Sequence, residues 1–189
     1  MDWLLVGLGN PGAEYLRTRH NAGFWFVRAL AADHGLILRP ERRWRCLAAT
    51  WSTSGQEIGL CLPQEFMNRS GGAVQAMAAF HKIPAARILV VHDDLDLPVG
   101  IARLKLGGGH GGHNGLRDID RALGSRAYWR LRIGIGHPGH KDAVVGYVLG
   151  VPGPAEKAAI DSAIAQALAV LPDFFAGRID QAQLTLHSN

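Results

Sequence analysis

Short apolar runs alternate with longer amphipathic stretches along most of the chain, and this alternation restricts the folds that the chain can adopt. The apolar runs have the length and composition of β-strands and lie at Trp3–Val6, Cys46–Trp51, Glu57–Leu62, Ile88–His92, Ile101–Leu106 and Trp129–Gly134. The longer stretches predict helices at Ala22–His34, Gly71–His81, Leu116–Leu123, Glu156–Phe174 and Asp180–His187. Strands interleaved with helices are typical of an α/β fold. We therefore expect a three-layer sandwich in which a twisted sheet lies between two helical layers.

One pair of strands predicts that the sheet is mixed rather than purely parallel. Cys46–Trp51 and Glu57–Leu62 are joined by the short polar link Ser52–Gln56, which favours an antiparallel hairpin. The sequence shows no internal repeat and no linker that would separate two domains. Because 189 residues are enough to build one hydrophobic core, we expect a single domain over residues 1–189.

The composition favours a soluble, cytoplasmic protein that does not enter membranes. Hydrophobic residues make up 48% of the chain, yet no apolar run approaches the length of about 18 residues that a membrane span needs. Asp2 stands where a signal peptide would carry a basic residue, and no small-residue cleavage site follows. Cys46 and Cys61 each lie in an apolar stretch, which is typical of reduced, buried cysteines.

The balance of charge suggests a phosphate-bearing partner. Lys and Arg together number 20 against 16 for Asp and Glu, and 16 of those cations are arginine. Arginine binds phosphate through a planar, bidentate fork, so this bias is compatible with nucleic acid. The basic stretch Arg39–Arg45, which includes Trp44, could hold an RNA stem, but a solvated connection between helix and strand explains it slightly better.

A glycine-rich turn follows the first strand and has the spacing of a dinucleotide-binding loop. Gly7, Gly9 and Gly12 form the pattern GxGxxG. However, Pro11 has no N–H to offer a pyrophosphate, and Asp33, at the distance of the usual ribose-binding acid, has a helical context. The pattern therefore predicts a tight turn at the carboxyl end of the first strand, where open α/β sheets place their sites.

Other polar segments also follow strands, and together they predict a site built from several loops. They read PQEFMNRSGG, VVHDDLDLPVG and KLGGGHGGHNG. His110 and His113 have a spacing compatible with a metal site, but the surrounding glycines would leave such ligands poorly ordered, and no HExxH pattern occurs. No GxSxG elbow is present, and Ser70 lies where a helix should begin, so a serine nucleophile is not expected.

Five segments in register resemble the bacterial peptidyl-tRNA hydrolase family. They are GLGNPGAEYLRTRHNAG, FMNRSG, HDDLDLP, KLGGGHGGHNG and RLRIGIGHP, and the resemblance extends from about Leu4 to Leu149. It implies a monomeric, cytoplasmic esterase that needs no metal or other cofactor. Such an enzyme cuts the ester between a peptide and the terminal ribose of tRNA, and so recycles tRNA from prematurely released peptidyl-tRNA.

Ester hydrolysis requires an activated water, a group that orients its base, and donors for the oxyanion. His20 suits the general base, because an imidazole of ordinary pKa is mostly neutral near neutral pH, and Asp93 can hold its other nitrogen. Asp94 or Asp96 could be confused with Asp93. The resemblance assigns further site residues: Asn10, Met67 and Asn68 to the peptide; Tyr15 and Phe66 to seating the substrate; Asn114 to the carbonyl and the water; Lys105, Arg132 and Lys141 to tRNA phosphates.

Each of these residues also has a purely structural interpretation, in which the asparagines and aspartates cap turns or helices and His20 is a surface residue. Two other functions stay open on the sequence alone. One is a non-catalytic RNA-binding protein similar to splicing factors, which would not need His20, Asp93, Asn10 and Asn114 together. The other is a dinucleotide oxidoreductase. Outside the motifs, His34, His81 and His187 are expected to be solvated helix residues.

Overall fold

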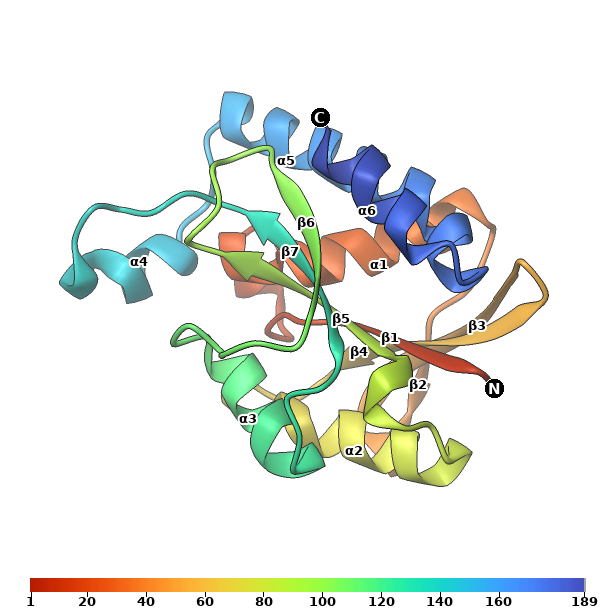
Figure 1. Ribbon diagram of the computed structural model, residues 1–189. Helices are drawn as coiled ribbons and strands as arrows, with labels where there is room; N and C mark the ends of the chain where they lie inside the picture. The colour runs from red at the N-terminus through yellow and green to blue at the C-terminus, as the bar shows by residue number, and fades with distance from the viewer. Residues whose placement is uncertain (189) are drawn as a thin grey trace.

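The computed structural model describes residues 1–188, and a seven-stranded mixed sheet forms its centre (Figure 1). In spatial order the strands are β2 (Arg39–Glu41), β3 (Cys46–Thr53), β4 (Gln56–Pro63), β1 (Trp3–Gly7), β5 (Ile88–Asp94), β7 (Trp129–Gly134) and β6 (Ala102–Leu106). The four strands β4, β1, β5 and β7 are parallel to one another. The strands β2, β3 and β6 pair antiparallel with their neighbours, so the expected hairpin and mixed sheet are confirmed.

Helices cover both faces of the sheet. On one face lie α1 (Ala22–Asp33), α5 (Pro154–Phe175) and α6 (Ile179–His187), and on the other lie α2 (Ser70–His81) and α3 (Asn114–Leu123) (Figure 1). The central strands are continuous apolar runs because both of their faces are buried. In β1, for example, Leu5 joins the core under α1 and α5, whereas Leu4 joins the core under α2. The three-layer α/β sandwich expected from the sequence is therefore confirmed.

The long helix α5 is apolar because it lies in this core. By length and composition alone it is the one helix among residues 1–188 that could cross a membrane. Its residues Ile160, Ala167 and Leu171 are fully buried, and the ring of Phe174 packs edge-on against Trp3 with 5.2 Å between centroids. Burial against the sheet accounts for its hydrophobicity.

The glycines of the first turn are required by close packing between β1 and α1. A Cβ at Gly9 would lie 2.6 Å from the ring of Phe24, and one at Gly23 would collide with the backbone of Leu8 and Val91. Gly9 and Gly23 thus allow the turn after β1 and the start of α1 to approach closely. The prediction of a tight turn after β1 is confirmed.

The sequence prediction missed two short elements. β2 is three residues of exposed or half-exposed chain, and α4 (Val144–Val148) is a single turn and a half, so neither carries a periodic pattern. The connection Arg39–Arg45 is consequently more structured than expected. It contains a 3₁₀ turn that buries Trp44, while the guanidinium of Arg43 lies 4.2 Å from the Trp44 ring and 4.6 Å from that of Phe80.

Two histidines that were expected to be solvated contact other parts of the protein. The ring of His81 packs between Trp44 and Phe80, at centroid distances of 5.2 and 4.9 Å. Nε2 of His187 accepts a hydrogen bond of 3.0 Å from the backbone N–H of Leu104 on the edge strand β6, and Gln183 donates to the carbonyl of the same residue. The prediction was wrong for His81, which is half-buried, whereas His187 lies exposed on α6 as expected and makes its hydrogen bond in addition. His34 is exposed, as expected.

Candidate active site

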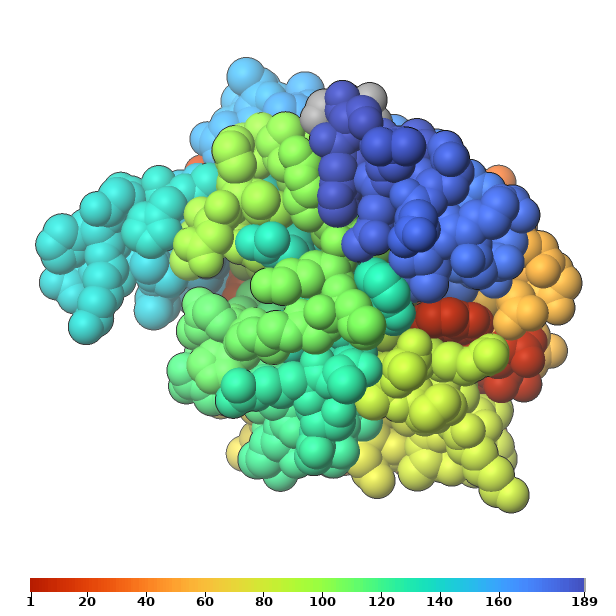
Figure 2. All heavy atoms as spheres, in the orientation of Figure 1, coloured from red at the N-terminus to blue at the C-terminus, as the bar shows by residue number. Residues whose placement is uncertain are grey.

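Segments that leave the carboxyl ends of the parallel strands β4, β1, β5 and β7 meet at one end of the sheet and border a cavity of about 730 Å³. The glycine loop, defined here as residues 107–112 between β6 and α3, forms another part of its wall, and so does α4. In Figure 2 the segment around α4 (cyan) projects from the body of the molecule. Cavities at this end of parallel strands are the usual sites of open α/β folds.

The residues assigned to the site from the sequence come together at this cavity, with one exception. Its lining includes Asn10, His20, Phe66, Met67, Asn68, Asp93, Lys105, Asn114, Arg132 and Lys141. The exception is Tyr15, whose ring packs edge-on against Phe66 with 6.3 Å between centroids. Tyr15 therefore supports a residue of the wall.

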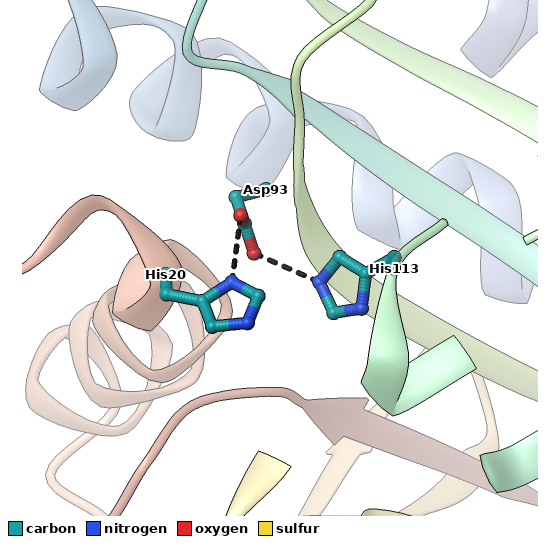
Figure 3. A group of neighbouring side chains, drawn as sticks. All are labelled: His20, Asp93 and His113. Carbon is teal, nitrogen blue, oxygen red and sulfur yellow. Dashed lines mark hydrogen bonds and ion pairs between the residues drawn. The ribbon is translucent and has the colours of Figure 1, made fainter. Parts of the chain in front are cut away.

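At the base of the cavity, His20 is held by Asp93. Nδ1 of His20 lies 2.9 Å from Oδ2 of Asp93, whose side chain is only 2% exposed (Figure 3). A carboxylate can only accept, so Nδ1 carries the hydrogen and donates it. Nε2 is then the unprotonated nitrogen, and it has no hydrogen-bond partner within residues 1–188. This arrangement leaves one basic nitrogen available at the cavity.

The other oxygen of Asp93 accepts from His113, a residue that the sequence analysis considered only as a metal ligand. Nε2 of His113 donates to Oδ1 at 2.9 Å (Figure 3). Its Nδ1 accepts from the backbone N–H groups of Gly115 and Leu116, and so caps α3. Because Nδ1 accepts, Nε2 must carry the proton, and His113 is fixed in one neutral tautomer. The signal in the sequence was a histidine immediately before a helix start.

The electrostatics of this cluster favour an ionised Asp93. Burial by itself raises the pKa of its carboxyl group, but the two imidazoles that donate to it hold the pKa well below its usual range. For His20, burial by itself lowers the pKa, but the charge of Asp93 and the hydrogen bond to it outweigh burial and raise the pKa above 6.5. Asp93 thus makes His20 a stronger base than an isolated imidazole.

A third histidine, His92, lies behind the cluster and stays neutral. Burial and the neighbouring His113 lower its pKa to about 4. Its Nδ1 donates to the backbone carbonyl of Asp93 at 2.8 Å, and its ring lies edge-on to His113 with 5.3 Å between centroids. It therefore packs against the cluster without adding a charge to it.

Asn10 is buried between two loops and is fixed in orientation by three hydrogen bonds. Its backbone exchanges bonds of 2.8 and 3.0 Å with the side chain of Asn21, directly after His20. Its Oδ1 accepts from the backbone N–H of Met67 at 2.7 Å, which identifies the oxygen of the amide and leaves Nδ2 without a protein partner in the described chain. Asn10 consequently offers the cavity a neutral N–H donor.

The side of the cavity around β4 is uncharged. Met67 is buried, whereas Phe66 and Asn68 are exposed on the 3₁₀ turn that leads into α2. Asn68 does not cap that helix, because no side chain bonds to its first turn from the cap position. Asn114 is also exposed, at the start of α3. These residues offer an apolar surface and neutral amides.

The side around β6 and β7 is cationic. Lys105 and Lys141 are exposed, and Arg132 forms an ion pair of 2.7 Å with Asp94. Oδ1 of Asp94 also accepts from the backbone N–H of Asp96. Asp94 is therefore committed to Arg132 and Asp96 is a loop residue, so of the three aspartates only Asp93 contacts His20.

The segment that carries His20 is tied to α4 by Arg19. The Arg19 guanidinium donates to the carbonyl of Tyr147 at 2.9 Å, lies 4.0 Å from the centre of its ring, and pairs with Glu156 at 3.0 Å. The backbone N–H of Arg19 donates to the carbonyl of Gly150. Arg19 thus holds α4, which forms one wall of the cavity, against the segment that carries His20.

The cluster of His20, Asp93 and His113 could also hold a metal ion. One potential ligand atom from each lies within 4.8 Å of the others. Nε2 of His20 is free to bind a metal, but both nitrogens of His113 are already hydrogen-bonded, and its Nε2 would have to lose the proton that it donates to Asp93. His110, the other histidine of the HxxH spacing, bonds to Gly112 of its own loop.

A mixed α/β sheet whose parallel strands present an oriented imidazole to an open cavity, with a cationic wall on one side, suits an enzyme that hydrolyses its substrate by general-base catalysis. The comparisons with known proteins identify the family. A family model described as peptidyl-tRNA hydrolase matches residues 4–189, and the chain belongs to this family.

Known proteins match almost the whole length of this chain in sequence and in structure. A peptidyl-tRNA hydrolase of Acidithiobacillus ferrooxidans is 71% identical over 189 residues and 100% of both chains, and one of Pseudomonas savastanoi is 54% identical over 98% of this chain and 96% of the other. A crystal structure of peptidyl-tRNA hydrolase from Acinetobacter baumannii superposes with a TM-score of 0.94 at 45% identity, covering 98% of this chain and 94% of that one. The alternative of a non-catalytic RNA-binding protein has no support among them.

Proposed function

We propose that this chain hydrolyses the ester between a peptide and the 3′-terminal ribose of tRNA, with His20 as the general base. The observation that carries the proposal is the pairing of His20 with Asp93, which leaves Nε2 unprotonated at the cavity. Membership of the peptidyl-tRNA hydrolase family supports the substrate. The neutral and cationic sides of the cavity match a substrate with a peptide at one end and a polyanion at the other.

The proposed reaction needs no covalent intermediate. Nε2 of His20 accepts a proton from water as the water oxygen attacks the ester carbonyl carbon, and Asp93 stabilises the imidazolium that forms. The tetrahedral intermediate then expels the ribose oxygen, which takes the proton from the imidazolium. The amides of Asn10 and Asn114 donate to the carbonyl oxygen or hold the water, and so stabilise the developing oxyanion without a fixed charge.

Substrate recognition divides between the two sides of the cavity. The Asn10 amide, Met67 and Asn68 contact the peptide, and Phe66 seats it with support from Tyr15. Lys105, Arg132 and Lys141 bind phosphates of the tRNA through charge-assisted hydrogen bonds. Arg132 can do so while it remains paired with Asp94, because its ion pair uses Nε and leaves the terminal nitrogens available.

We further propose that the enzyme acts as a cytoplasmic monomer without a metal or other cofactor. Both cysteines are free and buried, which suits a reducing compartment. All proposed catalytic groups come from one chain, so a second copy is not needed to complete the site. Sedimentation at working concentration should give the mass of one chain, 20.4 kDa.

The decisive experiment is release of N-acetyl-amino acid from N-acetyl-aminoacyl-tRNA by the purified protein. His20→Ala, prepared in parallel, controls for contaminating esterases. Release by the wild type and not by the variant supports the proposal. Equal release by both, or no release by the wild type, would refute it.

A further inference from the structure

The side chain of Arg130 is a buried cation that the proposed reaction does not use. It lies on β7, two residues before Arg132, and is 2% exposed. Placing a charged guanidinium inside a protein costs free energy unless its donors are satisfied. The partners of Arg130 therefore indicate what it does for the molecule.

Those partners are mainly carbonyl groups of the glycine loop. One terminal nitrogen of Arg130 donates to the carbonyl of Gly109 at 2.7 Å, and the other donates to that of Gly108 at 2.6 Å. Its carboxylate neighbour, Asp120, is farther away at 3.7 Å. Asp120 also accepts from the Tyr128 hydroxyl at 2.6 Å, and the Tyr128 ring lies 4.6 Å from the guanidinium. The loop carbonyls thus supply the close acceptors for this cation.

The glycine loop is anchored at its first half and not at its second. The N–H of Gly107 donates to the carbonyl of Tyr128, directly before β7, and Arg130 binds the next two carbonyls. Beyond Gly109, the hydrogen bonds of the loop within residues 1–188 are internal: the backbone N–H of Gly112 donates to the ring of His110, and the backbone N–H of His113 donates to the carbonyl of His110. The backbone at Gly108 has a φ of 105°, which side chains rarely allow, so glycine is what lets its carbonyl turn inward.

We propose that Arg130 is a positioning residue that holds the glycine loop in the conformation that lines the cavity and presents His113 and Asn114. If the loop lifted away, the guanidinium would lose two acceptors in a place that water reaches poorly, so the closed loop is the stable one. Lysine could not replace it fully, because an ammonium cannot reproduce a fork that spans two carbonyls. The part of this proposal that concerns turnover rests on the proposed function.

The test compares Arg130→Lys and Arg130→Gln with Arg126→Gln as a matched control. Arg126 also approaches Asp120, at 3.5 Å, but is exposed and contacts no loop carbonyl. Hydrogen exchange of the full chain is followed for residues 105–116 and, separately, for β1 and α5. Turnover of N-acetyl-aminoacyl-tRNA is measured as kcat and KM.

We expect exchange in the loop segment to accelerate about ten- to a hundredfold in Arg130→Gln and less in Arg130→Lys, with β1 and α5 unchanged. kcat/KM should fall about tenfold or more in Arg130→Gln, with partial rescue in Arg130→Lys, because a displaced loop misplaces Asn114 and the His113–Asp93 bond. The control should match the wild type in both.

Unchanged loop exchange in both variants would overturn the proposal, and so would faster loop exchange without any loss of kcat/KM. Faster exchange throughout β1 and α5 in Arg130→Lys would also overturn it, because the arginine would then be a general support of the fold. The exchange measurement needs no substrate. A wild type that fails to hydrolyse the ester therefore refutes the proposed function, whereas the exchange pattern decides on its own whether Arg130 anchors the loop.

Discussion

The two sides of the cavity differ in charge although the same sheet builds both. Near β4 the lining consists of an apolar surface and neutral amides, whereas near β6 and β7 it carries Lys105, Arg132 and Lys141. The order of the strands explains the division, because β1 and β5, which position His20 and Asp93, lie between β4 and β7. A linear substrate with one neutral and one anionic end can therefore bind across the reaction centre in only one direction.

Substitution of His20, which lies between the two sides of the cavity, should have the largest effect on turnover. Replacing His20 with Ala removes the proposed base and should lower kcat by about 10²- to 10⁴-fold, while affinity for tRNA stays near that of the wild type. Single-turnover kinetics and a separate binding titration measure the two quantities. His34→Ala, at the exposed histidine that follows α1, should behave as the wild type. A His20→Ala enzyme that keeps most of its turnover would move the base elsewhere.

Asp93→Asn should have the next largest effect and should change the pH profile. The proposed base, His20, would work unprotonated, and Asp93 raises its pKa, so wild-type activity should fall as the pH drops through a value above 6.5. Without the negative charge, burial remains and the midpoint should move to lower pH. The rate on the plateau should fall about 10- to 100-fold, because the ring loses its fixed tautomer. An unmoved acid limb in this variant would contradict the pairing.

Asn10→Asp tests the neutral side of the cavity. One carboxylate oxygen can still accept from the N–H of Met67, and the other would place a negative charge where the amide donor was. A free aminoacyl-tRNA carries an ammonium that the neutral site leaves unpaired, whereas an N-blocked substrate does not. The preference for N-acetylated over free aminoacyl-tRNA should narrow by about tenfold, judged by the ratio of kcat/KM values. An unchanged ratio would shift this role to Asn68.

Loss of a cation from the opposite side should have a smaller and uniform effect. Lys105→Ala or Arg132→Ala should raise KM by about fivefold for every tRNA and reduce the slope of log affinity against log salt by about one. kcat should change little. If either variant weakened binding of one tRNA alone, that residue would be recognising a base, and the division into a peptide side and a phosphate side would need revision.

The smallest effect is expected from removal of metals. Excess EDTA should leave activity unchanged, once magnesium's role in folding tRNA has been controlled with pre-folded substrate. Added zinc, in contrast, should inhibit by competing with protons at His20, Asp93 and His113, whose ligand atoms lie within 4.8 Å of one another. Activity that disappears in EDTA and returns with zinc would make the cluster a metal centre.

The sequence predicted the sheet and its main helices because burial on both faces leaves continuous apolar runs and periodic helices. It also placed His20, Asp93 and Asn10, since their motifs resemble those of a known family. It could not show that His113 shares Asp93 with His20, because that bond joins residues far apart in the chain. Arg130 was equally hidden, since an arginine within a strand gives no sign that it is buried beneath a loop.

The bonds from α6 to the edge strand β6 also bear on how the protein behaves in concentrated solution. A free strand edge is a template on which another chain can add, but here His187 and Gln183 occupy the N–H and carbonyl of Leu104. Only a neutral imidazole can accept that N–H, and burial and Arg103 lower the pKa of His187, which preserves the neutral form. Once acid protonates the ring, the N–H of Leu104 loses its acceptor, so we expect self-association on acidification to begin at this strand.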